Sequence, residues 1–146
     1  MQAARSRNGS LRRGHAVVEV ALFAPWIFFL FAGALDAGFY TYALISTENA
    51  ARVAAEYTSK SSATAADAST ACTYALDEMN TMSNVKSLAS CNSLPLIVTA
   101  SPVTSTDGSS ASAVSVKYQT AMLVPIPGLP GRITITRKVQ MMLKNL

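Results

Sequence analysis

The sequence predicts an α+β protein, in which a long N-terminal transmembrane α-helix continues into a small domain with a second helix and a short antiparallel sheet. In residues 16–35 the only charged side chain is Glu19. At ~1.5 Å per residue this apolar run covers about 30 Å, the thickness of the hydrocarbon core of a bilayer. After Asn84 the apolar residues begin to alternate with polar ones, which is typical of strands. The chain of 146 residues is long enough for one such domain.

The first helix is expected to run from His15 to about Thr58. Glu48, Arg52 and Glu56 follow one another at four-residue spacing, so they can pair on its polar side. Pro25 removes one backbone hydrogen bond, which predicts a kink or a local loosening that a membrane helix tolerates. The apolar stripe beyond the membrane is predicted to consist of Phe39, Tyr42, Ala43, Ser46, Ala50, Val53, Ala54 and Tyr57.

Past a turn at residues 59–62, a second helix is expected over about residues 63–82. It should cover the first helix with Ala65, Ala68, Cys72, Leu76 and Met79. Strands are expected at residues 94–100, 113–123 and 133–143, with a loop at residues 101–112. The last two strands should pair antiparallel and lay their apolar faces on the helices. In the third strand these apolar residues are Ile133, Ile135, Val139, Met141 and Leu143.

The segment from Pro125 to Gly131 is a stiff, apolar loop with two interpretations. It is either a rigid hairpin connection that tucks Ile126 and Leu129 into the domain, or an exposed patch that contacts a neighbouring subunit.

The charges predict an orientation and exclude a class of partner. Arg5, Arg7, Arg12 and Arg13 precede the apolar run, and no acid lies among them. Such an excess marks the cytoplasmic flank, so the N-terminus should be cytoplasmic and the following domain outside. These four arginines account for the net charge of +4, because the rest of the chain has 8 basic and 8 acidic residues. No basic patch for nucleic acid remains.

Glu19 has two interpretations. In the first helical turn, a carboxylate favours the positive end of the helix dipole and can reach the lipid headgroups. Alternatively, an intramembrane carboxylate is functional and needs a cation as a partner. If the chain were cut after Gly14, the free amine of His15 would lie about one helical turn away and could serve, including on a neighbouring chain.

These residues resemble the class III signal of type IV pilins and, more narrowly, the TadE-like minor pilins of the tight-adherence (Flp) pilus system. The resemblance is dense from about Arg12 to Tyr57, and His15 and Val20 are its mild departures. It implies a pilin-like fold and cutting after Gly14 by prepilin peptidase. It also implies a place in the bacterial inner membrane or in the pilus, with other pilin subunits and the inner-membrane assembly machinery as partners. The matching positions are Gly14, Glu19, Ala21, Leu22, Pro25, Gly33, Asp36, Gly38, Tyr40, Asn49, Ala50, Ala51 and Arg52.

Two other functions stay open from the sequence. The apolar run could belong to an ordinary secretory signal cut near Ala32-Gly33-Ala34, although this leaves Glu19 unexplained. Alternatively, the chain is a single-span anchored periplasmic binding or scaffold protein that keeps its leader and never enters a filament.

The cysteines and the remaining polar residues predict no catalytic or cofactor site. Cys72 and Cys91 would lie in an oxidising compartment and most simply form a disulfide; the alternative is a buried free Cys72 with Cys91 unpaired. His15 is the only histidine, so we expect neither a metal site nor a histidine-assisted nucleophile. The protein is therefore expected to be a peptidase substrate and not an enzyme.

Overall fold

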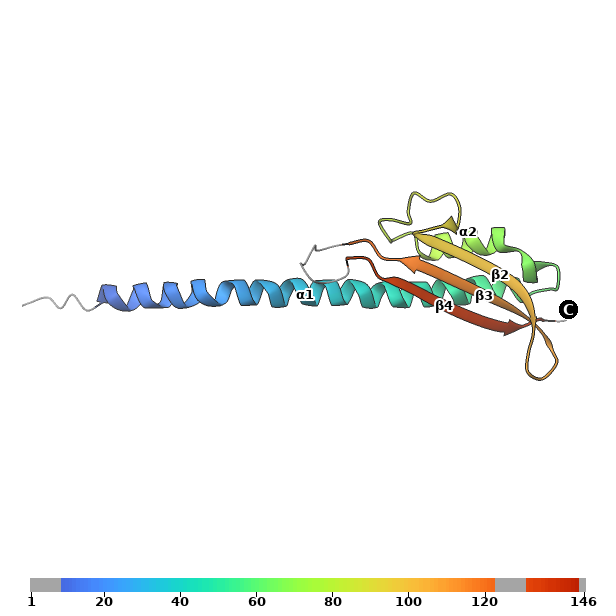
Figure 1. Cartoon of the computed structure of the whole chain (residues 1–146), viewed down its shortest axis with the longest axis horizontal. Coiled ribbons are helices and arrows are strands. Elements are labelled where there is room, and N and C mark those ends of the chain that lie inside the picture. Colours follow the sequence, from blue (N-terminus) through green and yellow to red (C-terminus); the bar gives the residue numbers. More distant parts are fainter. Residues whose placement is uncertain (1–8, 123–130, 145–146) are drawn as a thin grey trace, which may run out of the picture. The chain divides into compact units, whose positions relative to one another are not determined.

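A computed structural model describes residues 9–122 and 131–144. The chain divides into two compact units, Met1–Gly38 and Phe39–Leu146. The first helix, α1, spans Gly9–Thr58 and therefore contributes residues to both units (Figure 1). It starts six residues before the predicted start at His15. Gly14 does not end the helix because an α-helix tolerates a glycine at a cost of only about 1 kcal/mol.

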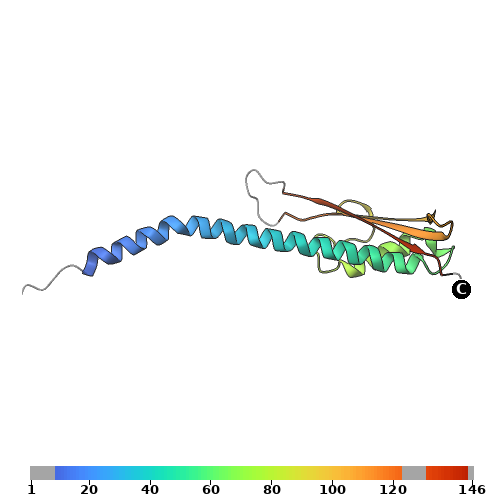
Figure 2. The ribbon, with the colours of Figure 1, turned by 90° about the horizontal axis from the view of Figure 1, so that it is seen from below.

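The second unit is a two-layer domain, with helices on one face of an antiparallel sheet (Figures 1 and 2). The sheet consists of β1 (Asn92–Ser93), β2 (Leu96–Thr104), β3 (Ser110–Gln119) and β4 (Thr134–Met142), hydrogen-bonded in this order. The helical layer contains the end of α1, a short 3₁₀ helix η1 (Thr64–Ala66) and α2 (Ala68–Glu78). The predicted α+β class is confirmed, as is the antiparallel pairing of the last two strands.

The buried part of the predicted stripe on α1 consists of its small residues, and Phe39, Val53 and Tyr57 are only partly buried. Ala43, Ser46, Ala50 and Ala54 are buried, whereas Tyr42 is 46% exposed and hydrogen-bonds Thr81. Because alanine is small, the helix axis lies close to the strands. The large side chains of the core therefore come from β2, from β3 and from the residues that follow α2. The largest fully buried ones are Tyr118, Met79, Met82, Leu96, Val85, Val114 and Val116.

The second helix is shorter than the predicted span of residues 63–82. The Asp67 carboxylate accepts a hydrogen bond from the Thr70 backbone N–H at 3.0 Å, which caps α2 and separates it from η1. This bond, with help from the Ser69 hydroxyl, lowers the pKa of Asp67 from 3.8 to about 2. Beyond Glu78 the chain makes successive tight turns that bury Met82 and Val85. Of the predicted stripe, Ala65, Cys72 and Met79 are buried, whereas Ala68 and Leu76 are only partly buried. The sequence missed Ala71 and Ala75, which are buried as well.

The first long strand extends further than predicted. The expected loop at residues 101–112 is wrong, because β2 continues to Thr104 and β3 begins at Ser110. Pro102 is tolerated because β1 pairs with β2 only at its start, which leaves this part of β2 at the sheet edge. Gly108, with φ +82°, makes the tight turn.

The other strands follow the predicted alternation more closely. In β4 and its flanks, Ile135 is buried and Ile133, Val139, Met141 and Leu143 are partly buried, while the intervening Thr134, Thr136, Lys138 and Gln140 are exposed. Strand β3 ends at Gln119, before the end predicted at residue 123, and Met122 beyond it is 51% exposed. Both interpretations of the apolar Pro125–Gly131 loop concern residues that, apart from Gly131, lie outside the described residues.

Cys72 and Cys91 form a disulfide with a Cα–Cα distance of 5.7 Å. The predicted pair is present, and the alternative of two free thiols is not observed. The bond joins the middle of α2 to the residue before β1. It therefore fastens the helical layer to the edge of the sheet.

Replacing Cys72 and Cys91 together by serine is expected to lower the free energy of unfolding by about 3 kcal/mol, because the bond closes a loop of roughly 20 residues in the unfolded chain. Urea unfolding of the full-length protein in detergent micelles, followed by proteolysis of the unfolded domain, measures this change. The parent protein under reducing conditions should behave like the double variant. An unchanged urea midpoint in both would show that the disulfide contributes nothing to stability.

Candidate functional site

The apolar half of α1 exposes its side chains almost without interruption. Every residue from His15 to Phe31 is exposed, including Trp26 (69%) and Leu30 (73%). By length and composition, one helix in the described part of the chain could cross a membrane. Its most apolar window has a mean hydropathy of 2.0 and is 6% buried. A core helix of a soluble protein with this composition would be mostly buried, so these side chains fit a single-pass membrane protein.

Glu19 lies on this exposed helix without an ion-pair partner among the described residues. The ion pairs of the described residues both involve Glu48 instead. The side chains of Ala16, Val20 and Phe23 flank Glu19 in an open apolar groove along the helix. His15 and Glu19 also line a second hollow together, as expected for residues four positions apart on one side of a helix.

Two other residues singled out from the sequence lie in the same helix. Gly14 is helical, so in the uncut chain the peptide bond that follows it is part of α1. The helix also continues through Pro25, its only proline. The kink at Pro25 and the cut after Gly14 stay predictions.

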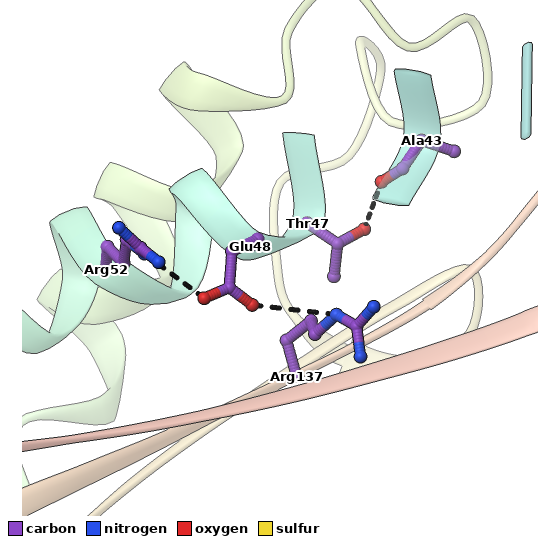
Figure 3. A network of polar contacts seen from close by, with 5 residues as sticks. All are labelled: Ala43, Thr47, Glu48, Arg52 and Arg137. Atoms are coloured by element: carbon purple, nitrogen blue, oxygen red, sulfur yellow. Dashed lines mark hydrogen bonds and ion pairs between the residues drawn. The ribbon is translucent and has the colours of Figure 1, made fainter. Parts of the chain in front are cut away.

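In the domain, α1 and the sheet are joined by a small polar network (Figure 3). Glu48 accepts a hydrogen bond from the Arg52 guanidinium at 3.1 Å on its own helix. Its other carboxylate oxygen lies 3.5 Å from Nε of Arg137 on β4. Thr47, next to Glu48, donates its hydroxyl hydrogen bond to the Ala43 carbonyl at 2.7 Å and so stays within the helix. Glu48 therefore connects two elements that are distant in sequence.

The sequence predicted the Glu48–Arg52 pair but missed Arg137. A clue was present, because Arg137 stands between Ile135 and Val139 in the alternating apolar positions of β4. A base on the helix-facing side of a strand is partly withdrawn from water, which favours an acid on the helix opposite it. Glu48 supplies that acid.

A second polar network, also missed from the sequence, anchors the turns after α2 to the end of β3. The Tyr118 hydroxyl donates to the Asn84 side-chain oxygen at 2.7 Å, and the Asn84 amide donates to the Gln119 carbonyl at 2.9 Å. Burial raises the pKa of Tyr118, so this hydroxyl remains a donor at all physiological pH values. These contacts support the core and leave no free reactive group.

Among residues 9–122 and 131–144 no group of three or more histidine, cysteine or acidic side chains could hold a metal ion. The chemically distinctive feature is therefore the exposed apolar helix with its single carboxylate.

Residues 14–56 match the family model described as TadE-like protein. The resemblance stated from the sequence is thereby confirmed over the long helix, from Gly14 through Glu19 to Arg52. This family is associated with pili and is structural, not enzymatic. No curated protein matches the chain, and no solved structure matches it.

The Glu48–Arg137 contact is expected to contribute about 0.5–1 kcal/mol to the stability of the domain, because both side chains are partly exposed to water. A double-mutant cycle with Glu48→Gln and Arg137→Ala, analysed by urea unfolding, isolates this coupling from the packing of the arginine stem. Lys138→Ala is the matched control on β4, because Lys138 is exposed and forms no ion pair within the described ranges. A coupling energy of zero would mean that the contact does not hold helix and sheet together.

Proposed function

We propose that this chain, TadE-like over residues 14–56, is the precursor of a minor pilin or pseudopilin that acts in the assembly or structure of a tight-adherence (Flp) pilus. The observation that carries the proposal is a helix that exposes every side chain from His15 to Phe31 and then packs its alanines into a folded domain. A helix of this kind can rest in lipid before assembly and against other helices afterwards. Its apolar surface is suited to both environments.

The proposed precursor lies in the bacterial inner membrane with its N-terminus in the cytoplasm and its domain in the periplasm. The four arginines before the apolar run favour this orientation. The Cys72–Cys91 disulfide also favours it, because such bonds persist in the oxidising periplasm and are rare in the cytosol. The proposed partners are prepilin peptidase, other pilin subunits, the assembly machinery and membrane lipid.

Processing would remove residues 1–14 and create a new N-terminus at His15. The family match begins at Gly14, the last residue of the proposed leader, which supports this boundary. Glycine is a weak helix former, so the uncut helix can open at Gly14 more easily than at its neighbours. The peptidase then needs to unwind only the first turns of α1 to reach the bond.

Glu19 would acquire its missing partner through this cut. A carboxylate in hydrocarbon is costly without a cation, and the described residues supply none. The new α-amino group of His15, on the same chain or on a neighbour offset along the helix axis, would provide one. The pair would set the register between helices more than the overall affinity, since paired charges in an apolar setting gain little net energy.

The mature N-terminus tests the processing step directly. We expect mass spectrometry of the protein from its own cells to find His15 as the first residue, and to find the leader intact when prepilin peptidase is absent. A peptidase-independent start at Met1 would instead indicate an anchored periplasmic protein. A start after Ala34 would indicate a secretory signal, and either result would overturn the proposal.

Replacing Glu19 by alanine is expected to leave processing nearly normal and to lower incorporation into sheared pili about tenfold, which corresponds to ~1.4 kcal/mol of lost interaction. Glu19→Gln keeps the shape of the side chain and should show the same defect if the charge matters. Val20→Ala, a change beside Glu19 that leaves the charge, is the matched control. Normal incorporation of the two Glu19 variants would exclude the proposed pairing.

A further inference from the structure

The outer face of the sheet carries positive charge without any negative charge. Lys117 on β3 and Lys138 on β4 are exposed, and β1 to β4 contain no aspartate or glutamate. In the β3–β4 register, Lys117 lies opposite Thr136, and Lys138 lies opposite Ser115. The two lysines are therefore diagonal neighbours, with Cα atoms about 7–8 Å apart. Their like charges repel, and neither lysine has an ion-pair partner in the described residues.

The end of α2 shows the opposite pattern. Asp77 and Glu78 occupy its last turn, are exposed, and have no base beside them in that turn. This is the negative end of the helix dipole, where carboxylates destabilise a helix and bases stabilise it. No ion pair of the described residues includes either acid. The fold of a single chain thus gives no reason for these two acids.

The two charged surfaces belong to opposite layers of the domain. Helix α2 packs against β2 on the inner face of the sheet, and its exposed side points away from the strands (Figures 1 and 2). Lys117 and Lys138 point the other way, because the alternate residues Val116 and Tyr118 are buried beneath the sheet. One chain therefore cannot bring its own acids to its own lysines.

We propose that the outer sheet face of one subunit receives the C-terminal turn of α2 from a second copy of this chain. Asp77 and Glu78 of one copy would pair with Lys117 and Lys138 of the next. The side chains beside the lysines on this face, among them Ile97, Ser115 and Thr136, are shorter than lysine, so the two ammonium groups can reach a helix end that approaches the sheet. This inference rests on the proposed function, since it names a contact between domains in the assembly.

The proposed contact joins two different surfaces, so it is heterologous. A heterologous contact leaves one free surface of each kind at the ends of any row of subunits. Such a contact extends into a helical filament unless its rotation closes a ring. Charge complementarity between the layers would thus supply a directional contact between domains, in addition to the apolar packing between helices.

Zero-length carbodiimide cross-linking tests this contact, because it joins a lysine to a carboxylate only when the two touch. The full-length protein, as an equal mixture of ¹⁴N- and ¹⁵N-labelled chains, is reconstituted into phospholipid vesicles at physiological salt. We expect mixed-label cross-links from Lys117 or Lys138 to Asp77 or Glu78. Their yield should fall at high salt, where exposed charges are screened.

Charge reversal then tests whether the pairing is specific. Lys117→Glu with Lys138→Glu, or Asp77→Lys with Glu78→Lys, should each lower the dimer fraction by roughly fivefold to thirtyfold. This fraction is measured by fluorescence energy transfer between labelled chains, because the substitutions also remove groups that carbodiimide joins. Dimer yield should recover when the two double variants are mixed with each other. Lys86→Glu, at an exposed site in the turns after α2, is the control for an altered net charge.

Native chains without mixed-label cross-links would overturn the inference, as would charge-reversed chains that associate like the native ones. The inference would also be overturned if mixing the two double variants did not restore the dimer yield, provided that circular dichroism shows both variants to be folded. The proposed function has a separate test, the mature N-terminus, and it fails if that terminus is not His15. A start at His15 together with absent cross-links would keep the minor pilin and discard this contact.

Discussion

The structure depends on one uninterrupted helix whose two halves must satisfy different surroundings. Residues 15–31 carry large apolar side chains that the protein leaves exposed, and the residues after Gly38 carry mainly small ones that it buries. Large side chains give the area that favours transfer into lipid, whereas small ones let a helix approach a sheet closely. The change in residue size along α1 therefore separates a membrane segment from a domain scaffold without any break in the backbone.

A scaffold lined by alanine has a consequence for stability. Ala43, Ala50 and Ala54 bury little area each, so the domain depends on the few large side chains that fill the other side of its core. Tyr118 and the methionines after α2 provide that bulk, and the Tyr118–Asn84 hydrogen bond holds the turns that carry them. The Cys72–Cys91 bond adds a constraint on the unfolded chain, which matters most for a domain with a small core.

The acidic residues divide into those that the fold uses and those that it does not. Glu48 binds two arginines across helix and sheet, and Asp67 caps α2. Glu19, Asp77 and Glu78 have no ion-pair partner among the described residues, although each lies where an unpaired carboxylate is unfavourable. The two contacts proposed above would account for all three, because other subunits would bring the partners, in the membrane for Glu19 and between domains for the other two.

The sequence by itself determined the features that depend on local composition and period. The apolar run, its single carboxylate and the alternation of β4 are readable residue by residue, because lipid, a helix dipole and a half-buried strand each impose a short-range pattern. The start and end of α2, the length of β2 and the Arg137–Glu48 contact required the tertiary structure. Alanine favours a helix throughout residues 63–82, and Ser and Thr have weak preferences in residues 101–112, so capping, long-range packing and strand pairing decide where these elements start and end. Which acid faces Arg137 is likewise decided only when β4 packs against α1, because Glu48 lies far from Arg137 in the sequence.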